Sequence, residues 1–271
     1  MSTQNALAQR LLSLQTPGQP LILTNIWDAI TASTIASLHG TKALATASFA
    51  IAAAAGLADE DLDLDTNLRA VQAIARVTKK HDLPLTVDMQ DGFGERLEEE
   101  IRRVIELGCV GCNLEDFGRE VQGEGGQGKG GLYGIEEACE RIKRVRKIAE
   151  ELDVPDFVIN ARTDSYFAGP KAGLDEAITR GKAYLAAGAS NIFIWGGPSR
   201  NGWGKGEVEK AVKALDGKLN VILVRMKKGG LGVEELREIG VARISVGPQL
   251  MIRSMARVKD EAEAILNGET V

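Results

Sequence analysis

Polar side chains stand where three short apolar segments of the chain end. Asp88 follows Leu85–Val87, Glu115 and Asp116 follow Val110–Leu114, and Asn160 and Arg162 follow Phe157–Ile159. If these segments are parallel strands of a closed barrel, their carboxyl ends meet at one mouth. Converging carboxylates supply the hard oxygen ligands that Mg²⁺ prefers, and an arginine fork binds a carboxylate or phosphonate. The pattern indicates an anion-binding magnesium site, with a purely structural ion-pair network as the competing interpretation.

Eight short apolar segments alternate along the chain with longer amphipathic ones. The segments expected to form strands are Leu21–Asn25, Ala43–Ala47, Leu85–Asp88, Val110–Glu115, Phe157–Ala161, Asn191–Trp195, Leu219–Val224 and Arg243–Val246. The stretches between them carry apolar residues at three- and four-residue spacing, which is typical of covering helices. Eight such units predict an α/β (β/α)₈ TIM-type barrel, formed as one domain by residues 1–271. An open doubly wound sheet is disfavoured, because no predicted strand leads into a G-x-G-x-x-G turn.

Two glycine-rich segments interrupt this alternation, Gly118–Gly134 and Gly196–Gly206. Both follow predicted strands, so we expect loops at the mouth of the barrel, where lids and binding segments are usually found. Lys129 is the basic residue deepest in the first segment and is a candidate for contact with a substrate anion. Gly123–Gly130 approaches a phosphate-binding loop but lacks its final Ser or Thr, so nucleotide binding is disfavoured.

The overall composition favours a small-molecule partner. A net charge of −5 and a pI near 5.3 argue against a broad nucleic-acid or anionic-membrane surface, since few positive charges are available to neutralise phosphates. The three cysteines do not suggest a disulfide framework, and Cys109-x-x-Cys112 lacks the second pair that a zinc site needs. With no membrane-length apolar stretch, we expect a cytoplasmic protein.

Several motifs resemble those of the phosphoenolpyruvate mutase/isocitrate lyase superfamily and occur in the same order. The resemblance extends from about Leu21 to Met255 and rests on Asn25–Ala29, Thr46–Ser48, Gly56–Asp59, Val87–Gly94, Asn113–Asp116 and Ile159–Asp164. It implies a barrel whose C-terminal helix is swapped between subunits, in a homo-dimer or homo-tetramer. It also implies Mg²⁺ and cleavage of a C–C or P–C bond in a small 2-oxo or hydroxy (di)carboxylate through an enolate-like intermediate.

The resemblance implies a role for each candidate residue. Asp88 would bind the metal, Glu115 would act on it largely through water, and Asp59 would belong to the outer acidic shell. Ser48 and neighbouring amides would hold the substrate carboxylate, which Arg162 would neutralise. Trp27 and Asp28 would line the same mouth. Asn160 and Trp195 are candidates because each lies at the end of a predicted strand, with packing as the alternative role for Trp195.

Two features depart from the family pattern. Gln90 stands where family members usually carry an acidic residue of the metal cluster, so we expect weaker metal binding. The segment Gly118–Gly134 lacks the cysteine of the lyase lid, which argues against ordinary isocitrate lyase chemistry. Two alternatives therefore remain open: a diverged barrel that only binds a metabolite, and a rearrangement that needs no metal.

Overall fold

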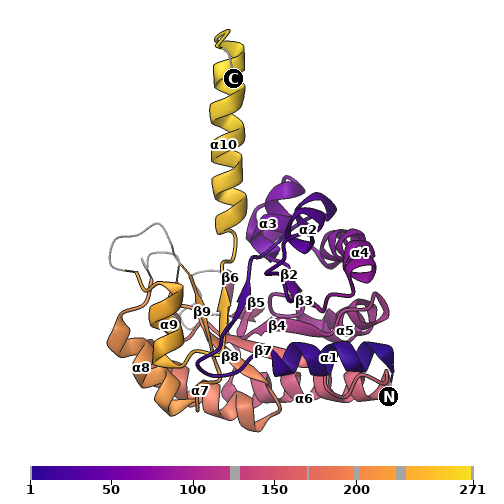
Figure 1. The fold of residues 1–271 in the computed structure, drawn as a ribbon. Coiled ribbons are helices and arrows are strands. Elements are labelled where there is room, and N and C mark those ends of the chain that lie inside the picture. The colour runs from indigo at the N-terminus through magenta and orange to yellow at the C-terminus, as the bar shows by residue number, and fades with distance from the viewer. Residues whose placement is uncertain (1, 123–128, 170, 198–201, 224–229, 270–271) are drawn as a thin grey trace.

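The computed structural model describes residues 2–122, 129–169, 171–197, 202–223 and 230–269. Eight parallel strands form one sheet in the order β1-β10-β9-β8-β7-β4-β3-β2. The two outermost strands approach each other through a parallel bridge between Ile26 and Thr46, in which the Ile26 N–H donates to the Ala45 carbonyl. The sheet is thereby closed into the predicted barrel, with helices around it (Figure 1).

All eight predicted strands are present, most of them one or two residues shorter than predicted. The barrel strands are β1 (Leu21–Leu23), β2 (Leu44–Ala45), β3 (Leu85–Asp88), β4 (Gly111–Glu115), β7 (Val158–Thr163), β8 (Asn191–Ile194), β9 (Leu219–Ile222) and β10 (Arg243–Ser245). Strand side chains alternate between the barrel interior and the helices, so the spacing of polar residues along each strand decides which of them face the mouth.

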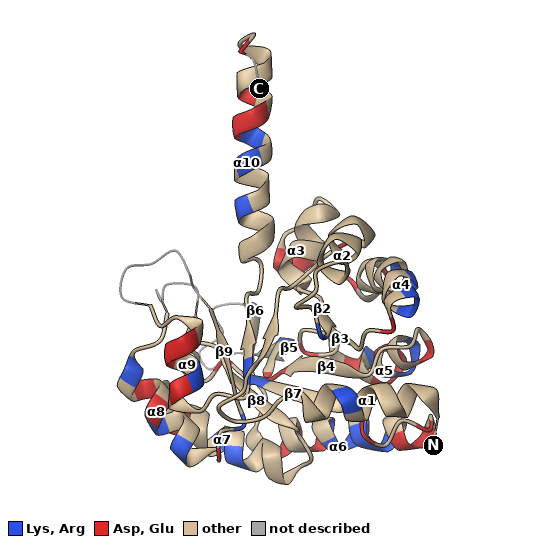
Figure 2. Cartoon of the chain, viewed as in Figure 1, with Lys and Arg blue, Asp and Glu red and all other residues tan. Residues whose placement is uncertain are grey.

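The helices lie between the strands, as the sequence periodicity predicts. They are α1 (Thr3–Ser13), α2 (Ala29–Ala36), α3 (Ser48–Ala54), α4 (Leu64–His81), α5 (Leu97–Glu106), α6 (Ile135–Glu151), α7 (Leu174–Ala186), α8 (Lys205–Ala214), α9 (Val233–Ile239) and α10 (Gln249–Leu266), with 3₁₀ turns η1 (Asp59–Asp61) and η2 (Gly94–Arg96). Lys, Arg, Asp and Glu are prominent on the outer helices, including α4, α5, α8 and α9 (Figure 2). Most of their apolar sides pack on the strands in one large core, and α3 contributes to a smaller second cluster with Trp27 and Leu62.

The glycine-rich segment after β4 is not simply a loop. Residues Phe117–Gln122 and Lys129–Leu132 form an antiparallel hairpin, β5 and β6. Glycine makes this hairpin possible because a Cβ at Gly118 would lie 2.5 Å from Cζ of Tyr133. Composition alone predicted a loop. In the structure, the missing Cβ of Gly118 lets the backbone come close to the Tyr133 ring. Residues 123–128, including most of the P-loop-like stretch, lie outside the described residues.

Helix α1 packs at the N-terminal ends of the strands, opposite the mouth. A Cβ at Gly111 in β4 would lie 3.0 Å from Cδ2 of Leu11, which shows how closely the helix approaches the strand. Asn5 of the same helix donates from Nδ2 to Asp156, just before β7, at 2.8 Å. This end of the barrel is therefore covered by the chain itself, and the opposite end is left for a site.

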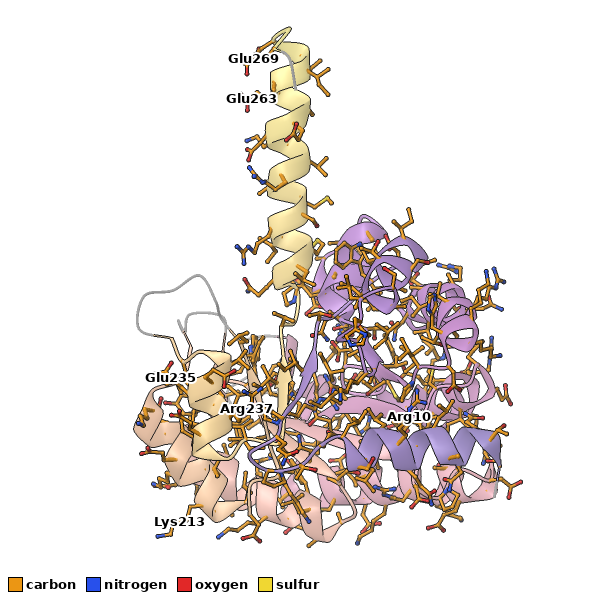
Figure 3. All side chains as sticks on the ribbon, viewed as in Figure 1. Arg10, Lys213, Glu235, Arg237, Glu263 and Glu269 are labelled. Atoms are coloured by element: carbon orange, nitrogen blue, oxygen red, sulfur yellow. The ribbon has the colours of Figure 1, made fainter. Side chains whose placement is uncertain are left out.

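Helix α10 does not pack beside β1 and α9, where the eighth barrel helix would lie, but projects away from the body (Figure 1). None of its residues is buried, and Figure 3 shows Glu263 on this isolated helix and Glu269 just beyond its end. Ile22, on the outer face of β1, is 41% exposed as a result. No helix within the described residues is long and apolar enough to cross a membrane.

Candidate functional site

A cavity of about 550 Å³ opens at the carboxyl ends of the barrel strands. This volume lies within the range of small-molecule sites. One part of its wall is polar, with Ser48, Asp59, Asp88, Asn113, Arg162 and Ser245. Another part is apolar, with Phe49, Phe193, Trp195, Trp203, Ile222 and Ile252.

Asp88, at the end of β3, is held in one orientation. Its Oδ2 accepts hydrogen bonds of 2.9 Å from both the backbone N–H and the hydroxyl of Ser48, the first residue of α3. The Asp88 N–H donates to Oγ1 of Thr46 at 2.8 Å. The second carboxylate oxygen, Oδ1, is buried and has no hydrogen-bond partner among the described residues. A buried carboxylate oxygen without a partner is costly, and binding a cation would remove that cost.

Arg162, on β7, is clamped by two carboxylates. Its Nη1 lies 2.7 Å from Oε1 of Glu115, and its Nε and Nη2 donate to Asp164 at 2.7 and 3.0 Å. The guanidinium also lies over the Trp195 ring, 4.2 Å from its centroid. Arg162 is therefore fixed before any ligand arrives, and its charge is already opposed by carboxylates on both sides.

Burial controls the ionisation of these groups. It raises the pKa of Glu115 well above its ordinary value, although the Arg162 guanidinium opposes the rise. Burial likewise raises the pKa of Asp164, again against Arg162. It works to lower the pKa of Arg162, but Asp164 and Glu115 reverse that effect and raise it overall. The pairing thus keeps a cation at the mouth in spite of its desolvation.

Asp59 lies on η1 and joins the cavity through a second polar cluster. Gln90 donates from Nε2 to Oδ1 of Asp59 at 3.0 Å and accepts from Arg119 of β5 through Oε1. Arg119 also donates to the carbonyls of Asp59 and Leu62, each at 2.9 Å. Burial and the nearby Asp88 raise the pKa of Asp59. A neutral Gln90 can bond both partners at once, with its amide facing the carboxylate and its carbonyl facing the arginine.

Three predicted site residues do not line this cavity. Trp27 and Asp28 line a separate cavity of about 450 Å³ beside α3 and α4, and the Asp28 carboxylate caps α2 by accepting from Thr31 N–H at 2.7 Å. Asn160 is fully buried beneath the cavity and donates to Oδ1 of Asn113. A strand-end motif places a residue near the mouth, but strand alternation and helix capping decide which way its side chain turns.

Two further candidates, Glu115 and Lys129, are not among the described lining residues. Glu115 pairs with Arg162, which does line the cavity. The backbone of Lys129 begins β6, but its side chain lies outside the described part of the structure.

The sequence analysis did not predict three residues that support the site, Asn113, Arg119 and Arg243. An arginine within the apolar run Val241–Val246 was the one available signal for Arg243.

Asp116 supports the end of β7 from behind. It accepts hydrogen bonds from the Thr163 hydroxyl at 2.6 Å, the Asp164 N–H at 2.9 Å and the Tyr184 hydroxyl at 2.7 Å. Arg180 pairs with it at 3.2 Å. This buried cluster fixes the backbone that carries Arg162, so the cavity rests on a satisfied polar network.

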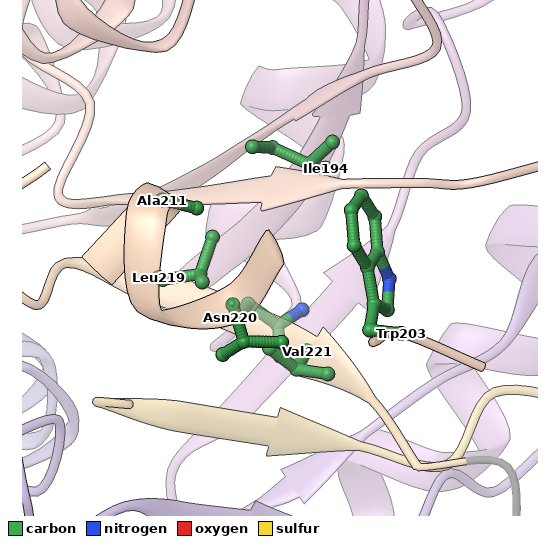
Figure 4. A pocket seen from close by; sticks show the side chains of 7 residues that line it. Ile194, Trp203, Ala211, Leu219, Asn220 and Val221 are labelled. Carbon is green, nitrogen blue, oxygen red and sulfur yellow. The ribbon is translucent and has the colours of Figure 1, made fainter. Parts of the chain in front are cut away.

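A second opening, behind β8 and β9, is too small to be a site. It holds about 10 Å³ and is lined mainly by apolar side chains together with Asn220, with Trp203 at one side and Leu219 and Val221 at another (Figure 4). One water molecule is the most such a volume could hold. Trp203 contacts both this space and the main cavity, so its ring separates them.

The donor set fits magnesium better than a metal that needs many protein ligands. Among the described residues, no group of three or more His, Cys, Asp or Glu side chains is arranged to hold a metal ion. Mg²⁺, however, is often held by only one or two carboxylates and otherwise by water and substrate. The unpartnered Oδ1 of Asp88 offers one such ligand. Cys109 and Cys112 are buried free thiols far from such a role, as the sequence suggested.

Comparison with known proteins finds relatives and a family model that match nearly the whole chain. The family model described as phosphoenolpyruvate phosphomutase matches residues 11–266. The crystal structure of a putative phosphonomutase from Burkholderia cenocepacia is 34% identical and superposes with a TM-score of 0.79, covering 98% of this chain and 99% of that one. A 2-methylisocitrate lyase of Bacillus subtilis is 31% identical over 71% of this chain and 60% of its own length.

A more distant solved structure shares the fold. A phosphonopyruvate hydrolase, crystallised with oxalate and Mg²⁺, is 23% identical with a TM-score of 0.79, and the match covers 99% of this chain and 89% of that one. The extent of the family match and the eight-stranded barrel lead to one conclusion. The chain belongs to the phosphoenolpyruvate phosphomutase family, within the phosphoenolpyruvate mutase/isocitrate lyase superfamily.

Proposed function

We propose that this protein is a magnesium-dependent enzyme that cleaves a C–C bond beside the carbonyl of a small 2-oxo or hydroxy carboxylate. The observation that carries the proposal is the unpartnered, buried Oδ1 of Asp88 at the mouth, beside a fixed arginine. Asp88 would hold the ion, with Asp59 acting on it through water and Glu115 holding Arg162 in place. Bound there, Mg²⁺ would stabilise the negative charge that develops on an enolate-like oxygen.

The residues around Asp88 position the reactants. Ser48 uses its N–H and hydroxyl to hold one oxygen of Asp88, which leaves the other without a described partner and available to the ion. Arg162, fixed by Asp164 and Glu115, presents a charged edge to the substrate carboxylate without having to reorganise. Trp195 covers the guanidinium and excludes water from that side of it.

The apolar part of the wall favours an organic substituent on the substrate. Phe193, Trp203 and Ile222 present aromatic and alkyl surface, which suits an alkyl or aryl group better than a second carboxylate. Arg162 is the only Lys or Arg among the described lining residues, and two carboxylates already oppose it. A phosphonate dianion would need more positive charge, so we favour C–C over P–C cleavage.

The test is turnover of a panel of 2-oxo and 2-hydroxy acids, with and without alkyl substituents, in Mg²⁺ and then in chelator. We expect activity only with metal, and Asp88→Asn should lower kcat/KM by roughly 100-fold or more, because it removes the charged ligand. Asp65→Asn, on the exposed side of α4, is the matched control and should retain activity. Full activity of Asp88→Asn would refute the assignment. Ligand binding without any turnover would indicate a metabolite-binding barrel instead.

A further inference from the structure

Arg243 lies inside the barrel, directly beneath the polar part of the cavity. It begins β10, is 1% exposed, and its Nη2 reaches across the barrel to Oδ1 of Asn113 on β4 at 3.2 Å. No carboxylate of the described residues lies within ion-pair distance of it. Its Nε and Nη1 have no hydrogen-bond partner among the described residues.

The charge of Arg243 is therefore poorly compensated by the chain. Burial lowers the pKa of Arg243 to about 10, an effect that the Cys112 thiol and the Asp88 carboxylate oppose. The guanidinium is still a cation at neutral pH. Leaving a cation buried without an opposite charge is expensive, which makes such a group a candidate for binding an anion.

Asn113 connects this cation to the cavity. Its Oδ1 accepts from Arg243 and also from Nδ2 of Asn160, at 2.7 Å. Because a guanidinium can only donate, the atom of Asn113 that faces it must be the oxygen, which settles the orientation of the amide. The Nδ2 of Asn113 is then directed away from Arg243, and the residue lines the cavity. No described residue accepts a hydrogen bond from this Nδ2.

We propose that Asn113 donates from Nδ2 to an anionic oxygen of the substrate, and that Arg243 is the positioning residue that orients this amide and places positive charge behind it. The ligand class is a carboxylate or enolate oxygen at the floor of the cavity. Asn160, itself bonded to Asn191 at 3.3 Å, completes the support from the side. The inference rests on the proposed function only in requiring a carboxylate ligand.

The experiment measures oxalate binding by calorimetry in Mg²⁺, together with kcat and KM and the melting temperature of each variant. We expect Asn113→Ala and Arg243→Met each to weaken oxalate binding by roughly tenfold or more, because each removes a hydrogen bond to a charged group or its support. The double variant should bind about as weakly as either single one, since both act on one contact. Arg243→Lys should restore part of the affinity.

A matched control separates positioning from mere stability. Arg146 is a partly buried arginine at the opposite end of the barrel, where it donates to the Gly188 carbonyl at 2.7 Å. Arg146→Met should lower the melting temperature and leave oxalate affinity unchanged. If wild-type protein binds oxalate and Arg243→Met or Asn113→Ala binds it equally well, the inference is wrong. If wild-type protein binds no oxalate with Mg²⁺, the proposed function fails first.

Discussion

Glu100 of α5 shows how a single buried carboxyl can set the pH dependence of stability. Its side chain is fully buried, Oε1 accepts from Asn67 at 3.3 Å, and Oε2 has no hydrogen-bond partner among the described residues. Burial raises the pKa of Glu100 well above its ordinary value, and the neighbouring Asp91 and Asp88 raise it further. The folded protein therefore prefers the neutral acid, while the unfolded chain ionises at an ordinary pKa.

The pH dependence of the free energy of unfolding tests whether Glu100 is neutral in the folded protein. A group whose pKa is raised by folding contributes stability that is complete below its unfolded pKa and is lost as pH rises toward its folded pKa. Glu100→Gln should thus gain free energy of unfolding over wild type as pH rises from about 4.5, by about 1.4 kcal/mol per pH unit until the folded carboxyl ionises. Urea unfolding across this range gives the difference. A difference that does not change with pH would contradict the neutral-acid interpretation.

At the scale of elements, the β5–β6 hairpin is tied to the mouth by one side chain. Arg119 bonds the carbonyls of Asp59 and Leu62 and the side chain of Gln90, so it links the hairpin to η1 and to the turn after β3. Each of these acceptors is partly or fully buried, so each would lose a partner if the guanidinium were removed.

We expect Arg119→Met to loosen the hairpin and raise KM by roughly five- to tenfold, with a smaller change in kcat. Amide hydrogen exchange along β5 should become faster, because the hairpin loses its link to η1. Arg237→Met on α9 (Figure 3) is the control, since among the described residues the Arg237 side chain pairs only with the exposed Glu234. Equal exchange along β5 in wild type and Arg119→Met would show that Arg119 does not hold the hairpin.

At the scale of the whole molecule, α10 carries an apolar stripe that the chain does not cover. Met251, Met255, Val258, Ala262 and Ile265 recur at alternating spacings of four and three residues, which places them on one side of the helix. The body also exposes apolar side chains on β1, on α2 and just after α2, namely Ile22, Ile30 and Leu38. We propose that a second copy of the chain covers the stripe, in keeping with the helix exchange that the family resemblance implies.

The hydrodynamic mass of the protein tests whether a second copy of the chain covers the α10 stripe. Val258→Glu should shift the protein from a homo-oligomer toward monomer, because it places a charge in the centre of the stripe. Ala256→Glu adds the same charge on the opposite side of α10 and should leave the mass unchanged. A wild-type protein that sediments as a monomer would refute the homo-oligomer. It would not affect the function proposed for the cavity at the barrel mouth.

The sequence by itself determined the barrel and the strands that carry the site. Eight apolar segments separated by amphipathic ones have few ways to bury both faces of a parallel sheet, so the strand positions followed from periodicity alone. Asp88, Arg162 and Trp195 were placed at the mouth for the same reason, because strand ends converge. These three predictions depend only on local pattern and on the closure of the barrel, whereas Ser48 was assigned to the mouth through the family resemblance.

Only the tertiary structure decided which side chains meet. Arg243 and Asn113 are 130 residues apart and touch because their strands face each other across the barrel, a pairing that no local pattern encodes. The Asp28 side chain caps α2 instead of lining the mouth. The side chain of Gln90 accepts a hydrogen bond from Arg119, which belongs to the β5–β6 hairpin. Hydrogen-bond partners are chosen by distance and direction in the folded chain, so they appear only once the strands are placed.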